Sequence, residues 1–265
     1  MFPTLTLFGK ELPPYMLCAL AGALSALLAS YLAGRKRGLD DVTTVTMGLL
    51  SFLGVGVGGC LLYGVTRIRT LWYFLSHLEL LQSFDDVLAA AQLVFGGSVF
   101  YGGLIGMILV CKLYIRKRKL SRDYMDLIAA AIPLFHAWGR LGCFLGGCCF
   151  GIESSFGFVY HYSPIAEANG VRRLPVSLFE AIFNAALCAF LYGCFRKKKY
   201  RGALINIYLY AYPLWRFGIE FFRGDMYRGF LWGLSTSQWV SILLVAVNTA
   251  VLLTRKRRGR TTQKA

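Results

Sequence analysis

The sequence carries little charge for its length. Only 16% of its 265 residues are charged, whereas 57% are hydrophobic. Soluble domains carry about 25% charged residues and lack apolar runs of about twenty residues. The composition therefore excludes an ordinary soluble domain and predicts an integral membrane protein.

Acidic residues are scarcer than basic ones, with 13 against 29 and a formal net charge of +16. A basic excess of this size can indicate nucleic-acid binding. Here, however, the basic residues gather in four clusters, each directly after an apolar segment: residues 35–37; 116–119 with 122; 196–199 with 201; and 255–258 with 260. We therefore expect a membrane, and no nucleic acid, as the partner.

Seven apolar segments are long enough to cross a bilayer. They cover residues of about 14–34, 43–66, 88–114, 124–149, 176–195, 203–222 and 237–254. Each basic cluster follows an odd-numbered segment, so all four clusters lie on one side, which the positive-inside rule makes cytoplasmic. We predict an all-α, multi-pass protein with seven transmembrane helices, the N-terminus outside and the C-terminus in the cytoplasm.

Internal repeats and linkers are also lacking, so residues 1–265 are predicted to form one integral-membrane domain. The first segment is not expected to be a cleaved signal peptide, because its flanking positive charge follows it. A lipid or solute transporter would show internal repeats and paired broken helices. A transporter is therefore kept only as the non-enzymatic alternative.

The most unusual stretch is HAWGRLGCFLGGCCFG at residues 136–151, inside the fourth apolar segment. An arginine in hydrocarbon costs at least about 2.5 kcal/mol, so it usually faces a bundle interior or a watery cavity and binds a ligand. Arg140 is therefore the first candidate functional residue. The alternative is an arginine that snorkels to the interface. Pro133 is predicted to kink this helix just before His136.

Further charged side chains lie near the outer ends of the next two segments. Glu180 is one turn inside the fifth, and Arg216 and Glu220 lie four residues apart on one face of the sixth, so they can pair. With Arg223 or Arg173, the arginines are suited to bind a phosphate or carboxylate, and a phospholipid headgroup is the anion at that depth. The alternative for Arg216 and Glu220 is an ion pair that only locks two helices.

Glycines gather in the second segment, at Gly54, Gly56, Gly58 and Gly59, and in GGSVFYGGLIG at residues 96–106. They predict close helix packing and a broken third helix. The connecting WYFLSHLELL is predicted to form an amphipathic helix at the outer interface.

Five motifs, in this order and over nearly the whole chain, resemble the prolipoprotein diacylglyceryl transferase family: FYGGLIG, GRLGCFLGGCCFG, LPVSLFE, WRFGIEFFRGD and STSQWVS. The resemblance implies an enzyme of the bacterial cytoplasmic membrane. Such an enzyme moves the diacylglyceryl group from phosphatidylglycerol, or another anionic phospholipid, to the lipobox cysteine of a prolipoprotein signal peptide. It implies no metal and no soluble cofactor.

The matching positions imply a set of site residues. Arg140 and Arg216 would stabilise the phosphate leaving group, and a base would generate the attacking thiolate. The predicted catalytic residues are Arg140, Arg216, Glu220, Tyr101, Cys143, Cys148 and His136. The predicted substrate-binding residues are Tyr15, Gly102, Gly103, Gly139, Gly142, Glu180 and Arg223.

Four positions depart from the family pattern. Tyr101 stands where the family has histidine, Cys143 where it has asparagine, Cys148 where it has glutamate, and Cys60 where it has arginine after Gly58-Gly59. The sequence leaves several roles open for Cys143, Cys148 and Cys149: thiol-redox chemistry, soft-metal binding, a covalent lipid carrier, or packing only. The C-x-x-x-x-C-C spacing is not a standard zinc pattern.

Overall fold

The computed structural model describes residues 5–7, 9–225 and 229–262. The chain divides into two compact units, residues 1–29 with 129–265 and residues 30–128. Helix α1 (Pro14–Lys36) and helix α6 (Asp123–Leu145) each contribute to both units. The candidate site lies in the first unit.

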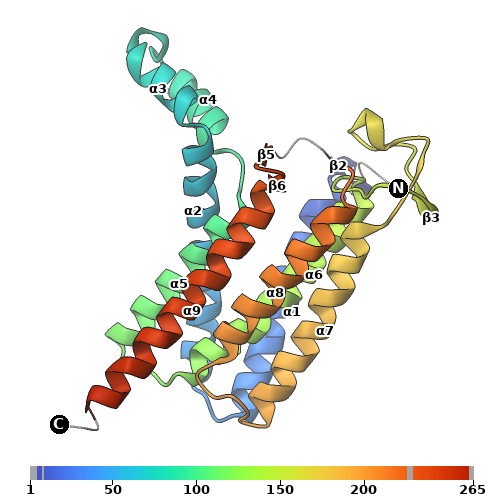
Figure 1. The fold of residues 1–265 in the computed structure, drawn as a ribbon. Coiled ribbons are helices and arrows are strands. Elements are labelled where there is room, and N and C mark those ends of the chain that lie inside the picture. Colours follow the sequence, from blue (N-terminus) through green and yellow to red (C-terminus); the bar gives the residue numbers. More distant parts are fainter. Residues whose placement is uncertain (1–4, 8, 226–228, 263–265) are drawn as a thin grey trace. The chain divides into compact units, whose positions relative to one another are not determined.

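Most of the described residues lie in helices, and the strands are few and short (Figure 1). The first unit holds parts of α1 and α6 with α7 (Val176–Arg196), η2 (Ala166–Ala168), α8 (Leu204–Ile219), η3 (Glu220–Phe222) and α9 (Thr236–Thr262). It also holds three two-stranded antiparallel sheets that were not predicted: β1 (Leu5–Leu7) with β2 (Lys10–Leu12), β3 (Glu153–Val159) with β4 (Arg172–Arg173), and β5 (Phe230–Leu231) with β6 (Leu234–Ser235). The second unit holds α2 (Asp41–Thr66), α3 (Ile68–Ser76), η1 (Leu78–Leu80), α4 (Phe84–Phe95) and α5 (Phe100–Lys117).

Five helices of the described chain are long and apolar enough to cross a membrane: α1, α2, α6, α7 and residues 236–254 of α9. Helices α4 and α5 meet at a bend of 96° and make a sixth span if they count as one. Along α1, Leu20, Leu24 and Leu28 are each at least 57% exposed, as expected of side chains that face lipid. The multi-pass helical prediction is therefore confirmed at five or six candidate spans, and seven spans are not confirmed.

Close helix contacts build the first unit. A Cβ atom on Gly22 of α1 would lie 2.8 Å from Cβ of Trp138 on α6, and one on Gly142 would lie 3.0 Å from Cα of Tyr15. Helix α7 packs on α8, and α8 packs on α9. A capping box opens α9, because Ser235 and Gln238 exchange hydrogen bonds between side chains and backbone N–H groups.

The second unit is organised by a close contact between α2 and α5 at the glycines for which close helix packing was predicted. A Cβ atom on Gly54 would lie 2.7 Å from Cα of Met107, and Gly58 faces the backbone of Gly102 and Gly106. The bend between α4 and α5, at residues 96–99, confirms the predicted break in the third apolar segment. The first half of the predicted amphipathic helix belongs to α3, but α3 ends at Ser76, and residues 78–80 form the separate short helix η1.

Helix α6 ends earlier than predicted. It runs without interruption through Pro133 but stops at Leu145, four residues before the predicted end of the span. Gly147 then adopts φ +73°, and the N–H groups of Gly147 and Cys148 donate to the carbonyls of Phe144 and Cys143. This pair of hydrogen bonds is a Schellman motif, which turns the chain sharply away from the helix axis.

Candidate active site

Glu180 is the centre of a buried ion cluster. Its side chain is 0% exposed and contacts three arginines. Oε2 lies 3.3 Å from Nη1 of Arg140 and 3.4 Å from Nη1 of Arg223, and Oε1 lies 3.6 Å from Nη1 of Arg216. The predicted convergence of Arg140 and Arg216 is thus confirmed, because both guanidinium groups contact one carboxylate.

Two further carboxylates complete the cluster. Arg216 pairs with Glu220 one turn along, as the spacing predicted, and also donates to Oγ of Ser237 at 3.2 Å. Arg223 binds both carboxylate oxygens of Asp225, at 2.8 and 2.7 Å. The three guanidinium groups are therefore matched by three carboxylates, which is the condition for keeping such charges out of water.

Arg140 is the most accessible arginine of the cluster. Its side chain is 12% exposed, against 2% for Arg216 and 3% for Arg223. Its Nε donates to Nε2 of His136 at 3.2 Å. Because its side chain is the least buried of the three, Arg140 is the arginine that an incoming anion reaches most readily.

His136 is positioned to orient Arg140. Because its Nε2 accepts from Arg140, that nitrogen carries a lone pair and the imidazole is neutral, with its proton on Nδ1. The ring also packs edge-on against Tyr212, with centroids 4.6 Å apart. Nε2 is thus occupied, and the geometry favours a positioning role over the predicted proton transfer.

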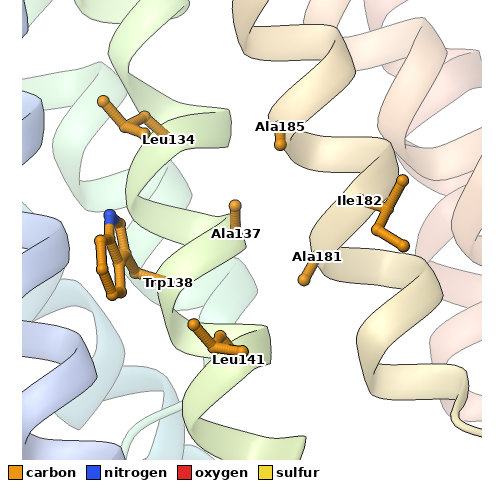
Figure 2. A pocket seen from close by; sticks show the side chains of 7 residues that line it. All are labelled: Leu134, Ala137, Trp138, Leu141, Ala181, Ile182 and Ala185. Carbon is orange, nitrogen blue, oxygen red and sulfur yellow. The ribbon is translucent and has the colours of Figure 1, made fainter.

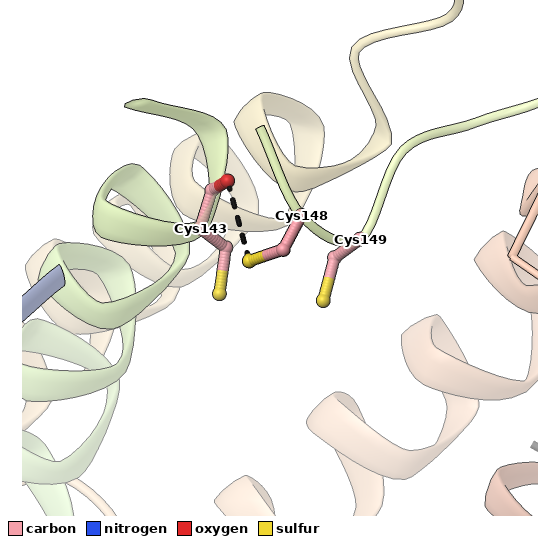
Figure 3. Close-up of side chains that lie close together, drawn as sticks. All are labelled: Cys143, Cys148 and Cys149. Atoms are coloured by element: carbon pink, nitrogen blue, oxygen red, sulfur yellow. Dashed lines mark hydrogen bonds between the residues drawn. The ribbon is translucent and has the colours of Figure 1, made fainter. Parts of the chain in front are cut away.

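The three cysteines converge beside this cluster (Figure 3). The Sγ atoms of Cys143, Cys148 and Cys149 all lie within 4.8 Å of one another. Helical periodicity does not bring them together, because Cys148 and Cys149 lie beyond the end of α6. The Schellman turn at Gly147 brings it back toward Cys143, and its Sγ contacts the Cys143 carbonyl at 3.5 Å.

The turn that carries Cys148 and Cys149 is held on both sides. The Ser177 hydroxyl donates to the Cys149 carbonyl at 2.7 Å, and the Ser163 hydroxyl donates to the Gly147 carbonyl at 2.9 Å. Cys149 itself has φ +58°, a left-handed conformation that residues with a side chain seldom adopt. The position of the thiols is therefore imposed by the surrounding loops.

The two thiols beyond α6 differ in pKa. Hydrogen bonds from Cys143 and Cys148 hold the pKa of Cys149 well below its usual range, and the charges of Arg223 and Arg140 act in the same direction. For Cys148, a hydrogen bond from Cys143 lowers the pKa, but the bond that Cys148 makes with Cys149 and its burial raise it to about 11. The acidic thiol of the pair is therefore Cys149, because the hydrogen bonds with both neighbouring thiols lower its pKa.

The remaining predicted residues fall into two groups. Tyr15 lies at the start of α1 against Gly142, near the cysteine turn, and Gly139 has open space beside it. Tyr101, Gly102 and Gly103 belong to the second unit, at the start of α5. There α2 fills the space beside both glycines, so they serve helix packing within that unit.

Arg173 does not join the ion cluster. Its guanidinium lies 4.6 Å above the Phe150 ring and donates to the carbonyls of Gly151 and Glu167. It therefore stabilises the loop that contains β3 and β4. Asp225, Ser177, Ser237 and Tyr212 have site contacts that the sequence reasoning missed. Of these, only Asp225 had a local signal, two residues after Arg223.

An apolar groove of about 280 Å³ runs between α6 and α7 (Figure 2). It is lined by Leu134, Ala137, Trp138, Leu141, Ala181, Ile182 and Ala185. Its lining residues Leu141 and Ala181 lie on the same two helices as Arg140 and Glu180.

The chain matches the family model described as "Prolipoprotein diacylglyceryl transferase" over residues 3–254. It belongs to the prolipoprotein diacylglyceryl transferase family. Two curated relatives named phosphatidylglycerol–prolipoprotein diacylglyceryl transferase are similar along nearly their whole length. The protein of Clostridium tetani is 29% identical over 92% of this chain and 94% of its own. One from Clostridium perfringens, numbered 2, is 31% identical over 96% of this chain and 95% of its own.

A relative of the same name from Campylobacter jejuni is 28% identical over 90% of this chain. Membership of the diacylglyceryl transferase family confirms the resemblance seen in the five sequence motifs. In this family member, the arginine-containing motifs of α6 and α8 meet at Glu180, which the motif LPVSLFE contributes.

Proposed function

We propose that this protein transfers the diacylglyceryl group of phosphatidylglycerol to the lipobox cysteine of a prolipoprotein. The reaction would take place in the outer half of the bacterial cytoplasmic membrane. The observation that carries the proposal is the convergence of Arg140, Arg216 and Arg223 on one buried carboxylate, with Arg140 open to a ligand. Family membership supplies the reaction class.

In the proposed reaction, the thiolate of the incoming lipobox cysteine attacks the glycerol carbon that carries the phosphate ester. A carbon–sulfur bond forms, the carbon–oxygen bond breaks, and glycerol phosphate leaves with the electron pair. Negative charge grows on the phosphate as this bond breaks. Arg140 would bind that phosphate directly, while Arg216 and Arg223 strengthen the positive field from behind.

The carboxylates have a separate role in this scheme. Glu180 and Glu220 hold the guanidinium groups in place before the lipid arrives, so little reorganisation is needed during the reaction. His136 fixes the orientation of Arg140. Tyr101, Cys143 and Cys148 remain proposed catalytic residues, and Tyr15, Gly139 and Gly142 remain proposed substrate contacts.

The groove between α6 and α7 supports a lipid substrate. It is apolar, and it lies between α6 and α7, the helices that carry Arg140 and Glu180. An acyl chain in this groove would leave the headgroup at Arg140. Binding energy from the chain would then help to position the reacting ester.

Complementation tests the proposal. Cells depleted of their own transferase should regain lipoprotein modification when they express the wild-type chain. Arg140→Ala should lose the activity by at least about a hundredfold, as expected for removal of one charge-stabilising donor. Arg140→Lys should recover only part of it, because lysine cannot bind phosphate in a bidentate way.

Arg172→Ala is the matched control, because Arg172 is an exposed arginine of β4 whose side chain, among the described residues, donates only to the Ser155 carbonyl. A well-inserted wild-type chain that restores no lipoprotein modification would show that this family member carries out another reaction. Equal activity of Arg140→Ala and Arg172→Ala would show that the arginine cluster takes no part in the mechanism.

A further inference from the structure

We propose that Cys143, Cys148 and Cys149 form a binding site for a soft monovalent metal ion of the copper(I) class, held by three thiolates. The site goes beyond the diacylglyceryl transfer, and its occupation does not depend on that reaction. It rests on the convergence of three sulfur atoms from two different segments, the end of α6 and the turn that follows.

The distances fit a three-coordinate ion. A metal–thiolate bond measures about 2.3 Å, so three sulfur atoms around one ion in a plane are about 4 Å apart. The three Sγ atoms already lie within 4.8 Å of one another. A shift of less than about 1 Å in each sulfur position, within reach of small χ1 changes, would close the site around an ion.

The donor set selects the class of ion. Among the described residues, the cluster contains three sulfur atoms and no histidine or carboxylate ligand. Thiolate donors favour copper(I), zinc and iron–sulfur clusters over magnesium, calcium or manganese. Structural zinc sites take four protein ligands. Three thiolates without a fourth protein donor therefore favour copper(I).

The backbone conformation of the turn brings the three thiols together. Gly147 and Cys149 both adopt left-handed conformations, and the two serine hydroxyls fix the carbonyls of the turn. These contacts hold the three thiols of the seven-residue interval 143–149 close together. Packing alone needs no such convergence, and a disulfide would use only two of the three sulfur atoms.

Charge around the site is also compatible with the proposal. Three thiolates and one monovalent cation carry a net charge of −2. Arg140 and Arg223 interact electrostatically with Cys149 and would offset part of this charge, because they are also paired with Glu180 and Asp225. The arginine cluster that supports phosphate binding would thus also stabilise an anionic metal–thiolate centre.

Direct binding of copper(I) to the purified full-length protein tests the site. The protein is reduced, kept in detergent without oxygen, and titrated with copper(I) against a coloured copper(I) chelator. We expect one ion per chain. Single Cys143→Ala, Cys148→Ala and Cys149→Ala substitutions should each weaken the affinity at least about tenfold, because each removes one of three ligands.

Cys188→Ala is the matched control, since Cys188 is also buried but lies eleven residues beyond Ser177 on α7. Thermal unfolding checks that each variant is folded, and Cys149→Ser keeps the side-chain volume while it removes the soft donor. The proposal is overturned if the triple alanine variant binds copper(I) as tightly as the wild type. It is also overturned if zinc displaces copper(I), or if Cys188→Ala has the same effect as the cluster variants.

Discussion

At the scale of single residues, Glu180 matters more than its position in the sequence suggests. A carboxylate one turn inside an apolar segment indicates a functional or paired group, but the sequence does not say with what it pairs. In the fold it contacts Arg140, Arg216 and Arg223. Removing its charge would leave three buried guanidinium groups facing one another.

Glu180→Gln should therefore destabilise the protein strongly. Breaking a buried ion pair by removing one partner costs about 3–5 kcal/mol. We expect a clear fall in the apparent Tm of the detergent-purified protein. Glu153→Gln should leave the Tm nearly unchanged, because the Glu153 side chain is 70% exposed and lies 3.8 Å from Arg173. Equal stability of the two variants would mean that the cluster does not hold this unit together.

The cysteines give a second test at this scale. Because the pKa of Cys149 is lowered and that of Cys148 is raised to about 11, Cys149 should be a thiolate at a pH where Cys148 is still protonated. Alkylation by a small neutral maleimide should thus modify Cys149 first at pH of about 7, and its rate should fall only at lower pH. Peptide mass spectrometry assigns the site. First labelling of Cys148 would contradict the assignment of the acidic thiol.

At the scale of elements, residue spacing predicted contacts within one helix, but it did not predict features that depend on contacts between several segments. The pairing of Arg216 with Glu220 follows from their separation by one turn. The end of α6 does not follow from residue spacing, because the apolar pattern continues to Phe150 although the chain turns at Gly147. If residues 146–149 continued the helix, Cys149 would point away from Cys143 and Cys148. Only the tertiary contacts from Ser163 and Ser177 define where that turn lies.

Close packing at the glycines of α2 was predicted from the sequence alone. The contact of α2 with α5 can be tested with two alanine variants, one at a packed glycine and one at an open glycine. A Cβ atom on Gly58 would collide with the Gly102 carbonyl oxygen, whereas one on Gly56 would meet nothing within 4 Å. Gly58→Ala should cost about 1–3 kcal/mol through overpacking. Gly56→Ala should be neutral or slightly stabilising, because alanine favours the helix. The Tm values of both variants from thermal unfolding test this prediction. Equal Tm values would exclude tight packing at Gly58.

At the scale of the whole molecule, the distribution of charge constrains the number of membrane crossings. Helix α8 has only 16 residues, but η3 follows it directly, so the helical segment ends at Phe222, where the sixth apolar segment was predicted to end. If α8 did not cross, the clusters at 196–199 and 255–258 would lie on opposite sides. If α4 and α5 together did not cross, the clusters at 35–37 and 116–119 would also be separated. Only seven crossings keep all four clusters on one side.

We therefore propose seven crossings with the N-terminus outside, and reporter fusions test this number. A fluorescent protein fused after Lys36 or after Lys198 should fluoresce, because both positions follow an odd number of crossings and lie in the cytoplasm. Alkaline phosphatase, which is active only outside, should be active when inserted after Asn169 in the long loop between α6 and α7. Activity of the phosphatase after Lys36 or Lys198 would contradict the proposed orientation. Phosphatase activity after Lys198 would also place the arginine cluster on the cytoplasmic side. The reason is that Glu180 lies near the start of α7, whereas the turn at 196–201 follows its end.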